Sequence, residues 1–256
     1  MPAKASSAYG AQQPNQQLAN NQLWTHKLLP ALLLIACCWL AASVVNKGMA
    51  SAYYFKANYY LELWQRKPDT LTAASWQQAA EAIEKAVELH PTHPHYLLIL
   101  AKINEWAWYK KIKTADQILV NEQLYKLAIE LRPAWPNAYA DYAYYLGIVN
   151  FRISEAFAEL AKAAHYGPYT SEVYQRTLLI SASRWSLLNG EQKVQSFKAL
   201  EQMIKNSYGT YRNALEIANS YKLARPFCIY LKLKNTEFSS ETREKIDKDF
   251  CGTSTK

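Results

Sequence analysis

Three stretches of this chain align on one proline each: AVELHPTHPHYL at Ala86–Leu97, AIELRPAWPNAY at Ala128–Tyr139 and AAHYGPYTSEVY at Ala163–Tyr174. The aligned prolines are 42 and 35 residues apart: Pro91, Pro133 and Pro168. Proline cannot continue a helix, but it fits just after the end of one helix or at the start of the next. Each proline therefore marks a turn between two helices, and the chain contains an internal repeat.

Small and bulky residues also keep their places in the repeat. Five residues before each proline is an alanine, and eight before it is a bulky side chain: Ala86, Ala128 and Ala163, with Ile83, Tyr125 and Leu160. Small residues where helices cross, with large ones beside them, indicate packed helix pairs. At 3.6 residues per turn, Tyr125, Ala128 and Leu131 are predicted to share one buried stripe.

Composition favours an all-α fold. The 256 residues include 7 glycines, too few for a sandwich or barrel rich in tight turns. The net charge is +8, but beyond Glu62 the basic residues are dispersed singly among carboxylates. Dispersed charge is typical of solvated helix faces, whereas nucleic-acid binders concentrate it, so no nucleic-acid partner is expected.

An apolar segment lies near the N-terminus. Leu28–Val45 contains 18 residues without a charge, and as a helix it would span about 27 Å, close to the thickness of a bilayer core. We expect residues 1–26 to be a short disordered cytoplasmic tail, 27–46 a transmembrane anchor and 48–256 a periplasmic domain. This predicts a single-pass protein of a bacterial inner membrane, although flanking lysines bias the orientation only weakly.

Other readings of this segment remain open. Ala50-Ser51-Ala52 resembles a signal-peptidase site, and Leu34-Ile35-Ala36-Cys37 fits a bacterial lipobox that would make Cys37 a lipidated N-terminus. The segment would also suit a buried core helix. In the rest of the chain, Cys228 and Cys251 are the two cysteines, and a bridge between them would add on the order of 3 kcal/mol. We expect that disulfide in an oxidising compartment.

The small, bulky and proline positions resemble the tetratricopeptide repeat (TPR) over roughly Trp76 to Ser183. The resemblance implies an all-α, TPR-like solenoid of helical hairpins behind the single N-terminal transmembrane helix. The 42-residue spacing implies an insertion around residues 110–117. Helices near 191–206 and 208–224 are expected to extend the array, Arg225-Pro226 to stop it, and a hydrophilic helix near 240–250 to cap it.

The TPR resemblance also implies a binding face, formed by the first helix of each unit. The positions carried over that we take as candidate binding residues are His95, Lys102, Glu105, Trp106, Asn137 and Tyr144. Aromatic residues on this face would stack on sugar rings or anchor a peptide, although packing within the core is the ordinary role of such side chains. Chaperone-docking repeats grip a terminal carboxylate with Lys and Asn at two positions, which here are Leu98 and Lys102, then Ala140 and Tyr144. A carboxylate clamp is therefore not expected.

A more particular resemblance concerns AIEKAVELHPTHPHYLLILAKINEW and a late FCIYL, which with the short basic tail and one anchor look like the VpsP-type polysaccharide biosynthesis proteins. It implies a scaffold or accessory protein for extracellular polysaccharide synthesis or export. The expected partners are other proteins of an envelope complex, the membrane and, as a further candidate, a glycan. A repeat scaffold of another envelope machine, for secretion, pilus or cytochrome assembly, fits the same features.

Signals for catalysis are poor. The chain has no dinucleotide-binding or phosphate-binding loop, no nucleophile elbow and no zinc-protease motif. His90, His93 and His95 cluster in one turn, and Asp247-Lys248-Asp249 resembles the D-x-D of sugar transferases, but that motif needs an α/β fold. We therefore predict no enzyme, no cofactor and no metal site, with a glycan-modifying enzyme as the weakest alternative.

Overall fold

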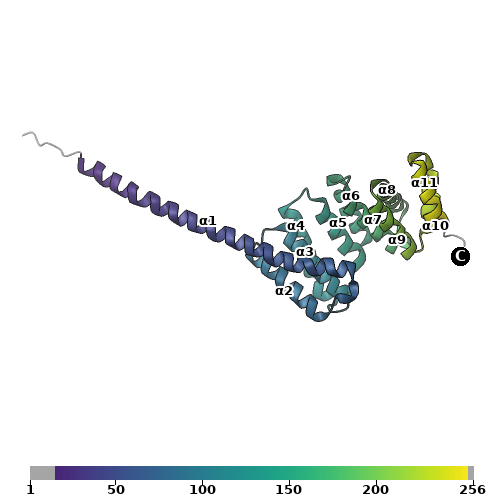
Figure 1. Ribbon diagram of the computed structural model, residues 1–256, viewed down its shortest axis with the longest axis horizontal. Coiled ribbons are helices and arrows are strands. Elements are labelled where there is room, and N and C mark those ends of the chain that lie inside the picture. Colours follow the sequence, from purple (N-terminus) through teal and green to yellow (C-terminus); the bar gives the residue numbers. More distant parts are fainter. Residues whose placement is uncertain (1–14, 253–256) are drawn as a thin grey trace, which may run out of the picture. The chain divides into compact units, whose positions relative to one another are not determined.

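The computed structural model describes the backbone of residues 15–252 and the side chains of residues 28–252. Within that part the chain is helical, with eleven α-helices, short 3-10 or π-helical turns and no strand (Figure 1). The α-helices are α1 (Asn15–Arg66), α2 (Ala73–Leu89), α3 (Pro94–Tyr109), α4 (Val120–Leu131), α5 (Pro136–Tyr144), α6 (Ile153–Tyr166), α7 (Ser171–Ser183), α8 (Gly190–Asn206), α9 (Tyr208–Ser220), α10 (Ala224–Leu233) and α11 (Ser240–Ile246).

The chain divides between Met49 and Ala50 into two compact units. In the described residues, one helical stretch, Leu28–Arg66, is long and apolar enough to cross a membrane. No residue of its most apolar 18-residue window is buried. A core helix would be buried, so the core-helix alternative is wrong. Length and composition suit a membrane span, and the position near the N-terminus also suits a signal sequence.

Helix α1 begins at Asn15, ahead of the predicted anchor at residue 27. Residues 1–14 of the predicted tail lie outside the described residues. The backbone of residues 15–26, which we expected to be disordered, is helical. Once a helix exists, each added residue gains a backbone hydrogen bond at little extra cost, so a polar flank can extend it.

From Ala50 onward the helices pack as successive hairpins. Helix α3 packs on α4, α5 on α6 and α7 on α8, while α7 also contacts α5 and α9. The aligned prolines stand in the turns between hairpins, and Pro94 and Pro136 are the first residues of α3 and α5. At that position a missing N–H costs no helical hydrogen bond. The second unit is thus a TPR-like solenoid of helical hairpins.

Capping side chains set where several of these helices begin. Thr72, Asn189 and Ser207 each accept a hydrogen bond from a backbone N–H in the first turn of α2, α8 and α9. In all three helices the third residue returns a bond to the cap's own N–H. Such reciprocal caps satisfy donors that would otherwise lack partners at a helix start.

The array starts earlier than the sequence similarity indicated. Ala57, Leu61 and Trp64, in the last turns of α1, are buried in one cluster with side chains of α2 and α3. The Ser51 hydroxyl lies 3.1 Å from that of Tyr96 on α3. Residues 50–66 therefore act as the first helix of a hairpin with α2. No aligned proline precedes residues 50–66, so the repeat pattern in the sequence starts only at α2.

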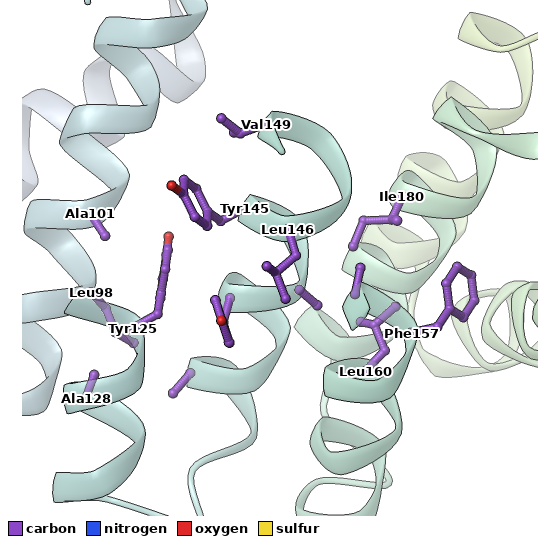
Figure 2. Close-up of a cluster of buried hydrophobic side chains, with 14 of the residues drawn as sticks. Leu98, Ala101, Tyr125, Ala128, Tyr145, Leu146, Val149, Phe157, Leu160 and Ile180 are labelled. Carbon is purple, nitrogen blue, oxygen red and sulfur yellow. The ribbon is translucent and has the colours of Figure 1, made fainter. Parts of the chain in front are cut away.

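Close helix contacts are made at the aligned alanines. Ala86, Ala128 and Ala163 have no solvent-exposed surface, each at 0%. Tyr125 is also fully buried, and Figure 2 shows it beside Tyr145, with ring centroids 5.8 Å apart. Leu131, however, is 39% exposed, so placing it on the buried stripe was wrong. It is the last residue of α4.

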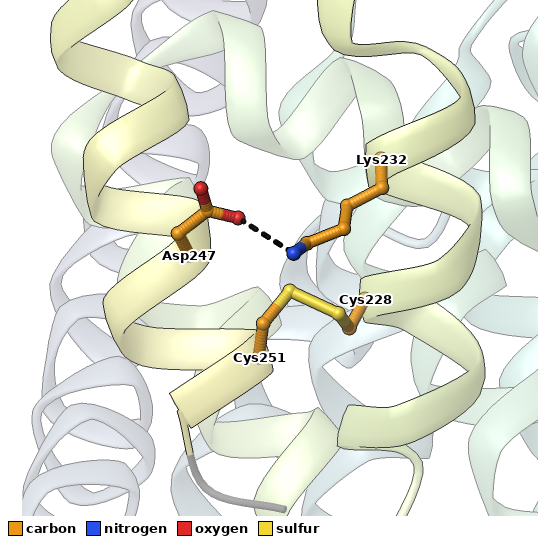
Figure 3. Close-up of a disulfide and its surroundings, with 4 residues drawn as sticks. All are labelled: Cys228, Lys232, Asp247 and Cys251. Atoms are coloured by element: carbon orange, nitrogen blue, oxygen red, sulfur yellow. Dashed lines mark ion pairs between the residues drawn. A yellow bond between two sulfur atoms is a disulfide. The ribbon is translucent and has the colours of Figure 1, made fainter.

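The C-terminal end departs from the prediction that Arg225-Pro226 stops the array. Instead Pro226 lies in the first turn of α10, where proline is tolerated. Beyond it, α11 continues into a π-helical turn, Asp247–Cys251. A disulfide joins Cys228 of α10 to Cys251, with Cα atoms 5.2 Å apart, and Lys232 pairs with Asp247 beside it (Figure 3). The bridge closes the end of the array.

We expect Ala128→Leu to destabilise the second unit by about 1–3 kcal/mol, because a larger side chain overfills a close helix contact. Glu130→Ala is the control on the same helix, since Glu130 is exposed, and should change stability by less than about 0.5 kcal/mol. Urea melts of the segment starting at Gly48 measure both. Equal midpoints for the two variants would contradict the alignment of the repeats on their prolines.

The disulfide predicts the thiol content of the protein isolated from its own cell. Alkylation of the denatured, unreduced chain should label Cys37 and Cys38, the two free cysteines, and leave Cys228 and Cys251 unlabelled. Mass spectrometry after alkylation measures this. Labelling at all four positions would place the repeat domain in a reducing compartment and would contradict a periplasmic location.

Candidate functional site

A groove with a volume of about 700 Å³ runs along the first helices of successive hairpins. Because repeats stack with the same orientation, their equivalent helices share one face. The lining comes from the end of α1 and from α3, α5, α7 and α9: Gln65, Lys102, Glu105, Trp106, Trp108, Tyr109, Asn137, Ala140, Asp141, Tyr144, Glu172, Gln175, Arg176, Leu179, Asn213, Glu216, Ile217, Ser220 and Tyr221. We refer to this surface as the groove.

The structure brings most of the candidate binding residues into the groove. Its lining includes Lys102, Glu105, Trp106, Asn137 and Tyr144. His95 does not line it. The His95 ring lies in the first turn of α3, with Nε2 3.1 Å from the Tyr54 hydroxyl of α1, and packs near Trp135. Burial, helped by the charge of Lys102, lowers the pKa of His95 to about 4, so this ring is neutral at physiological pH.

An ion-pair network that the sequence analysis did not foresee forms the floor of the groove. Asp141 of α5 is buried, and its Oδ2 lies 2.5 Å from Nζ of Lys102 on α3. Its Oδ1 accepts hydrogen bonds from Nε and Nη2 of Arg176 on α7, at 3.2 and 3.0 Å. Burial would raise the pKa of Asp141, but the charges of Lys102 and then Arg176 hold it below its ordinary value. Both oxygens of this carboxylate are therefore engaged.

Asp141 and Arg176 were not among the predicted binding residues because they occupy the sixth position of the first helix in their units. The family pattern takes its lining from other positions. The two residues are 35 residues apart, which is the spacing of the second and third prolines. Opposite charges at one position of adjacent repeats were the available signal, since equivalent positions on neighbouring helices lie side by side.

Glu105 is the second buried carboxyl group of the groove, with 8% of its surface exposed. The Tyr125 hydroxyl, from α4, donates a 2.6 Å hydrogen bond to its Oε1. Burial raises the pKa of Glu105 to about 7, against the effects of Tyr125 and of the charges of Arg176 and Lys102. Glu105 can therefore gain or lose a proton near neutral pH.

Aromatic rings form the walls beside Glu105. Trp106 and Tyr109 of α3 meet nearly at right angles, at 86° with centroids 5.6 Å apart. The guanidinium group of Arg176 lies 4.5 Å from the ring centre of Tyr144. Burial, followed by the charge of Glu105, raises the pKa of Tyr144 to about 12, so its hydroxyl keeps its proton. The groove thus offers ring faces next to charged groups.

The described residues contain no group of three or more His, Cys, Asp or Glu side chains placed to hold a metal ion. Two histidines of the α2–α3 turn make ring contacts: His93 stacks on Tyr96 with ring centroids 3.9 Å apart and packs edge-on against His90. In the former D-x-D candidate, Asp249 accepts a 3.0 Å hydrogen bond from Tyr211, while Asp247 pairs with Lys232. These carboxylates hold the C-terminal helices together.

Comparison with known proteins gives a likeness of fold. No protein-family model and no curated protein matches the sequence. The crystal structure of PilW, a widely conserved type IV pilus biogenesis factor, is similar over 79% of this chain and 87% of its own, with 18% sequence identity and a TM-score of 0.47. The role in pilus biogenesis is a property of PilW.

The raised pKa of Glu105 predicts a pH dependence of stability. Between pH 4.5, the ordinary carboxyl value, and about 7, the folded chain keeps a proton that the unfolded chain has released. Stability should therefore fall as the pH rises through this window. Glu105→Gln keeps an acceptor for Tyr125 but cannot ionise, so its stability relative to wild type should rise from pH 5 to pH 8, by on the order of 3 kcal/mol.

Urea melts of the segment from Gly48 at both pH values measure this difference, with Glu130→Gln as the exposed control. The control should keep the wild-type pH dependence. If Glu105→Gln also keeps it, then Glu105 is ionised in the folded protein at both pH values.

Proposed function

We propose that this chain is a non-enzymatic scaffold of the bacterial inner membrane, whose groove docks a segment of a partner protein on the periplasmic side. The anchor is the apolar stretch of α1 that begins at Leu28. The observation that carries the proposal is the groove itself, formed by the first helices of successive hairpins. Such a face recurs along the array and suits an extended segment rather than a compact small molecule.

The dimensions of the groove support a peptide-sized ligand. Its lining crosses α3, α5, α7 and α9, and neighbouring helix axes lie about 8–10 Å apart, so three steps give roughly 24–30 Å. An extended chain rises about 3.3 Å per residue, so this length corresponds to roughly seven to nine residues. Half-exposed aromatic side chains next to polar ones are typical of surfaces that bind protein segments.

The chemistry of the groove favours binding over catalysis. Asp141 is held between Lys102 and Arg176, so its oxygens are not free to take a proton from a substrate. Glu105 has a pKa suited to an acid or base, but the carboxyl group whose charge acts on it, Asp141, is itself engaged by Lys102 and Arg176. A glycan-modifying activity therefore receives no support from these contacts.

We propose that the scaffold belongs to a complex for extracellular polysaccharide synthesis or export, as the VpsP-type resemblance of the sequence implies. Assembly of another envelope structure, such as a secretion system, a pilus or a cytochrome, is the second candidate. The anchor and the helical array support both equally, and the identity of the docked protein separates them.

Crosslinking in living cells tests the proposal. A photoreactive amino acid at Tyr109, which lines the groove and is 62% exposed, should form a covalent adduct with a partner protein. The same amino acid at Tyr169, 88% exposed but in the α6–α7 turn, is the matched control and should form none. Mass spectrometry then identifies the partner.

An adduct with a glycosyltransferase or a chain-length regulator supports the polysaccharide role, and one with a secretion, pilus or cytochrome component supports the second candidate. Equal yields at the two positions, or no adduct at Tyr109, would show that the groove is not the docking surface.

A further inference from the structure

Glu105 has an oxygen that the protein itself does not use. Its Oε1 accepts the hydrogen bond from Tyr125, and in the described part of the chain no donor lies within hydrogen-bonding distance of Oε2. The residue is more than nine-tenths buried and also lines the groove. Oε2 is not among the fully buried side-chain atoms that lack a partner, so it opens to the groove, where a ligand can supply a donor or a positive charge.

The cations of the groove are not available for this purpose. Lys102 and Arg176 both bind Asp141, and Arg176 also covers the face of Tyr144. The remaining charged side chains of the lining are all carboxylates, Glu105, Glu172 and Glu216. With four carboxyl groups against two cations, the fully ionised groove carries a formal charge of −2, in a chain whose net charge is +8. The groove is therefore complementary to a positive group.

The rings beside Glu105 suit the same kind of group. Tyr109 lies one helical turn after Glu105 and three residues after Trp106, so it can meet both side chains, and all three residues line the groove. The perpendicular Trp106 and Tyr109 rings form a corner, and ring faces attract ammonium and guanidinium groups. The stacking of Arg176 on Tyr144 is an example of the same interaction within the groove.

We infer that the segment docked in the groove presents a lysine or arginine side chain, whose cationic group binds Oε2 of Glu105 within the corner formed by Trp106 and Tyr109. This inference rests on the proposed function, since it specifies what the groove selects. It reverses the chemistry of a carboxylate clamp: the protein supplies the carboxylate and the partner supplies the cation.

Binding of a cation would also stabilise the ionised form of Glu105. The groups that face this carboxyl are Tyr125 from α4, Lys102 from α3, Asp141 and Tyr144 from α5, and Arg176 from α7. The pKa of Asp141 lies below its ordinary value, and the pKa values of Tyr125, Tyr144 and Arg176 lie above theirs, so among these groups Glu105 is the one expected to titrate between pH 6 and 8. Affinity for the cation should fall as the pH falls below about 7.

Peptide pools test the inference on the full chain in nanodiscs of phosphatidylcholine, a lipid without net charge. Each pool holds fluorescent ten-residue peptides with a fixed central residue, Lys, Arg, Gln or Glu, and randomised flanks. Fluorescence anisotropy at pH 8 should show the Lys and Arg pools binding about tenfold more tightly than the Gln pool. Non-specific attraction to a chain of charge +8 would favour the Glu pool instead.

Variants locate the preference. Glu105→Gln should abolish it while keeping the acceptor for Tyr125, and Glu216→Gln, the same charge change at an exposed position of the groove, should leave it intact. Tyr109→Phe should keep the preference and Tyr109→Leu should weaken it, because the ring and not the hydroxyl makes the corner. Tyr109 is exposed, so these two variants report on binding even if Glu105→Gln disturbs the fold.

The outcomes separate this inference from the proposed function. Equal binding of all pools would keep the groove as a docking site and overturn the cation preference. Tightest binding of the Glu pool would show that cationic side chains of the protein, and not Glu105, select the peptide, and would also overturn it. If no pool binds, the proposed function fails as well. Binding of maltohexaose, a neutral sugar, in place of any peptide would make the groove a glycan site.

Discussion

Close contact between neighbouring helices at small residues is the constraint on which the rest of this structure depends. Ala86, Ala128 and Ala163 are completely buried, one in the second helix of each of three hairpins. Gly147 extends the same rule to the first helices, since a Cβ there would lie 2.8 Å from Ile180 of α7 and 3.2 Å from Ala156 of α6. Side chains this small let the helices approach closely, and the bulky neighbours then fill the space between them.

This packing brings the first helices of the hairpins side by side, and the groove follows from that. The first helices α3, α5 and α7 lie next to one another, so Asp141 binds Lys102 on one side and Arg176, its equivalent in the next repeat, on the other. Buried ion pairs add little net stability, but loss of one partner leaves an uncompensated charge and costs about 3–5 kcal/mol. The network therefore fixes how three hairpins align more than it strengthens the fold.

Prediction from the sequence succeeded where a residue has the same consequence in any helical array. Pro91, Pro133 and Pro168 located turns because proline cannot continue a helix, and the buried alanines followed from their spacing to those prolines. It failed where the outcome depends on a neighbour. Leu131 is apolar and has the spacing of the buried stripe of α4, but it is the last residue of that helix and is exposed. His95 occupies a position that lines the binding face in TPR proteins, but its ring contacts Tyr54 of α1.

The sequence by itself determined that this chain is helical, that its helices pair, and that an apolar stretch of membrane-spanning length precedes them. Those properties depend on local hydrogen bonding and on hydrophobic periodicity, which residues close together in the sequence determine. Tertiary structure decided that α1 supplies the first helix of the array, that Asp141 is engaged and that Glu105 keeps an open oxygen beside two aromatic rings. The charge of Asp141 depends on Lys102 and Arg176, 39 and 35 positions away in sequence, and Glu105 depends on Tyr125, 20 positions away. Only packing brings these residues together.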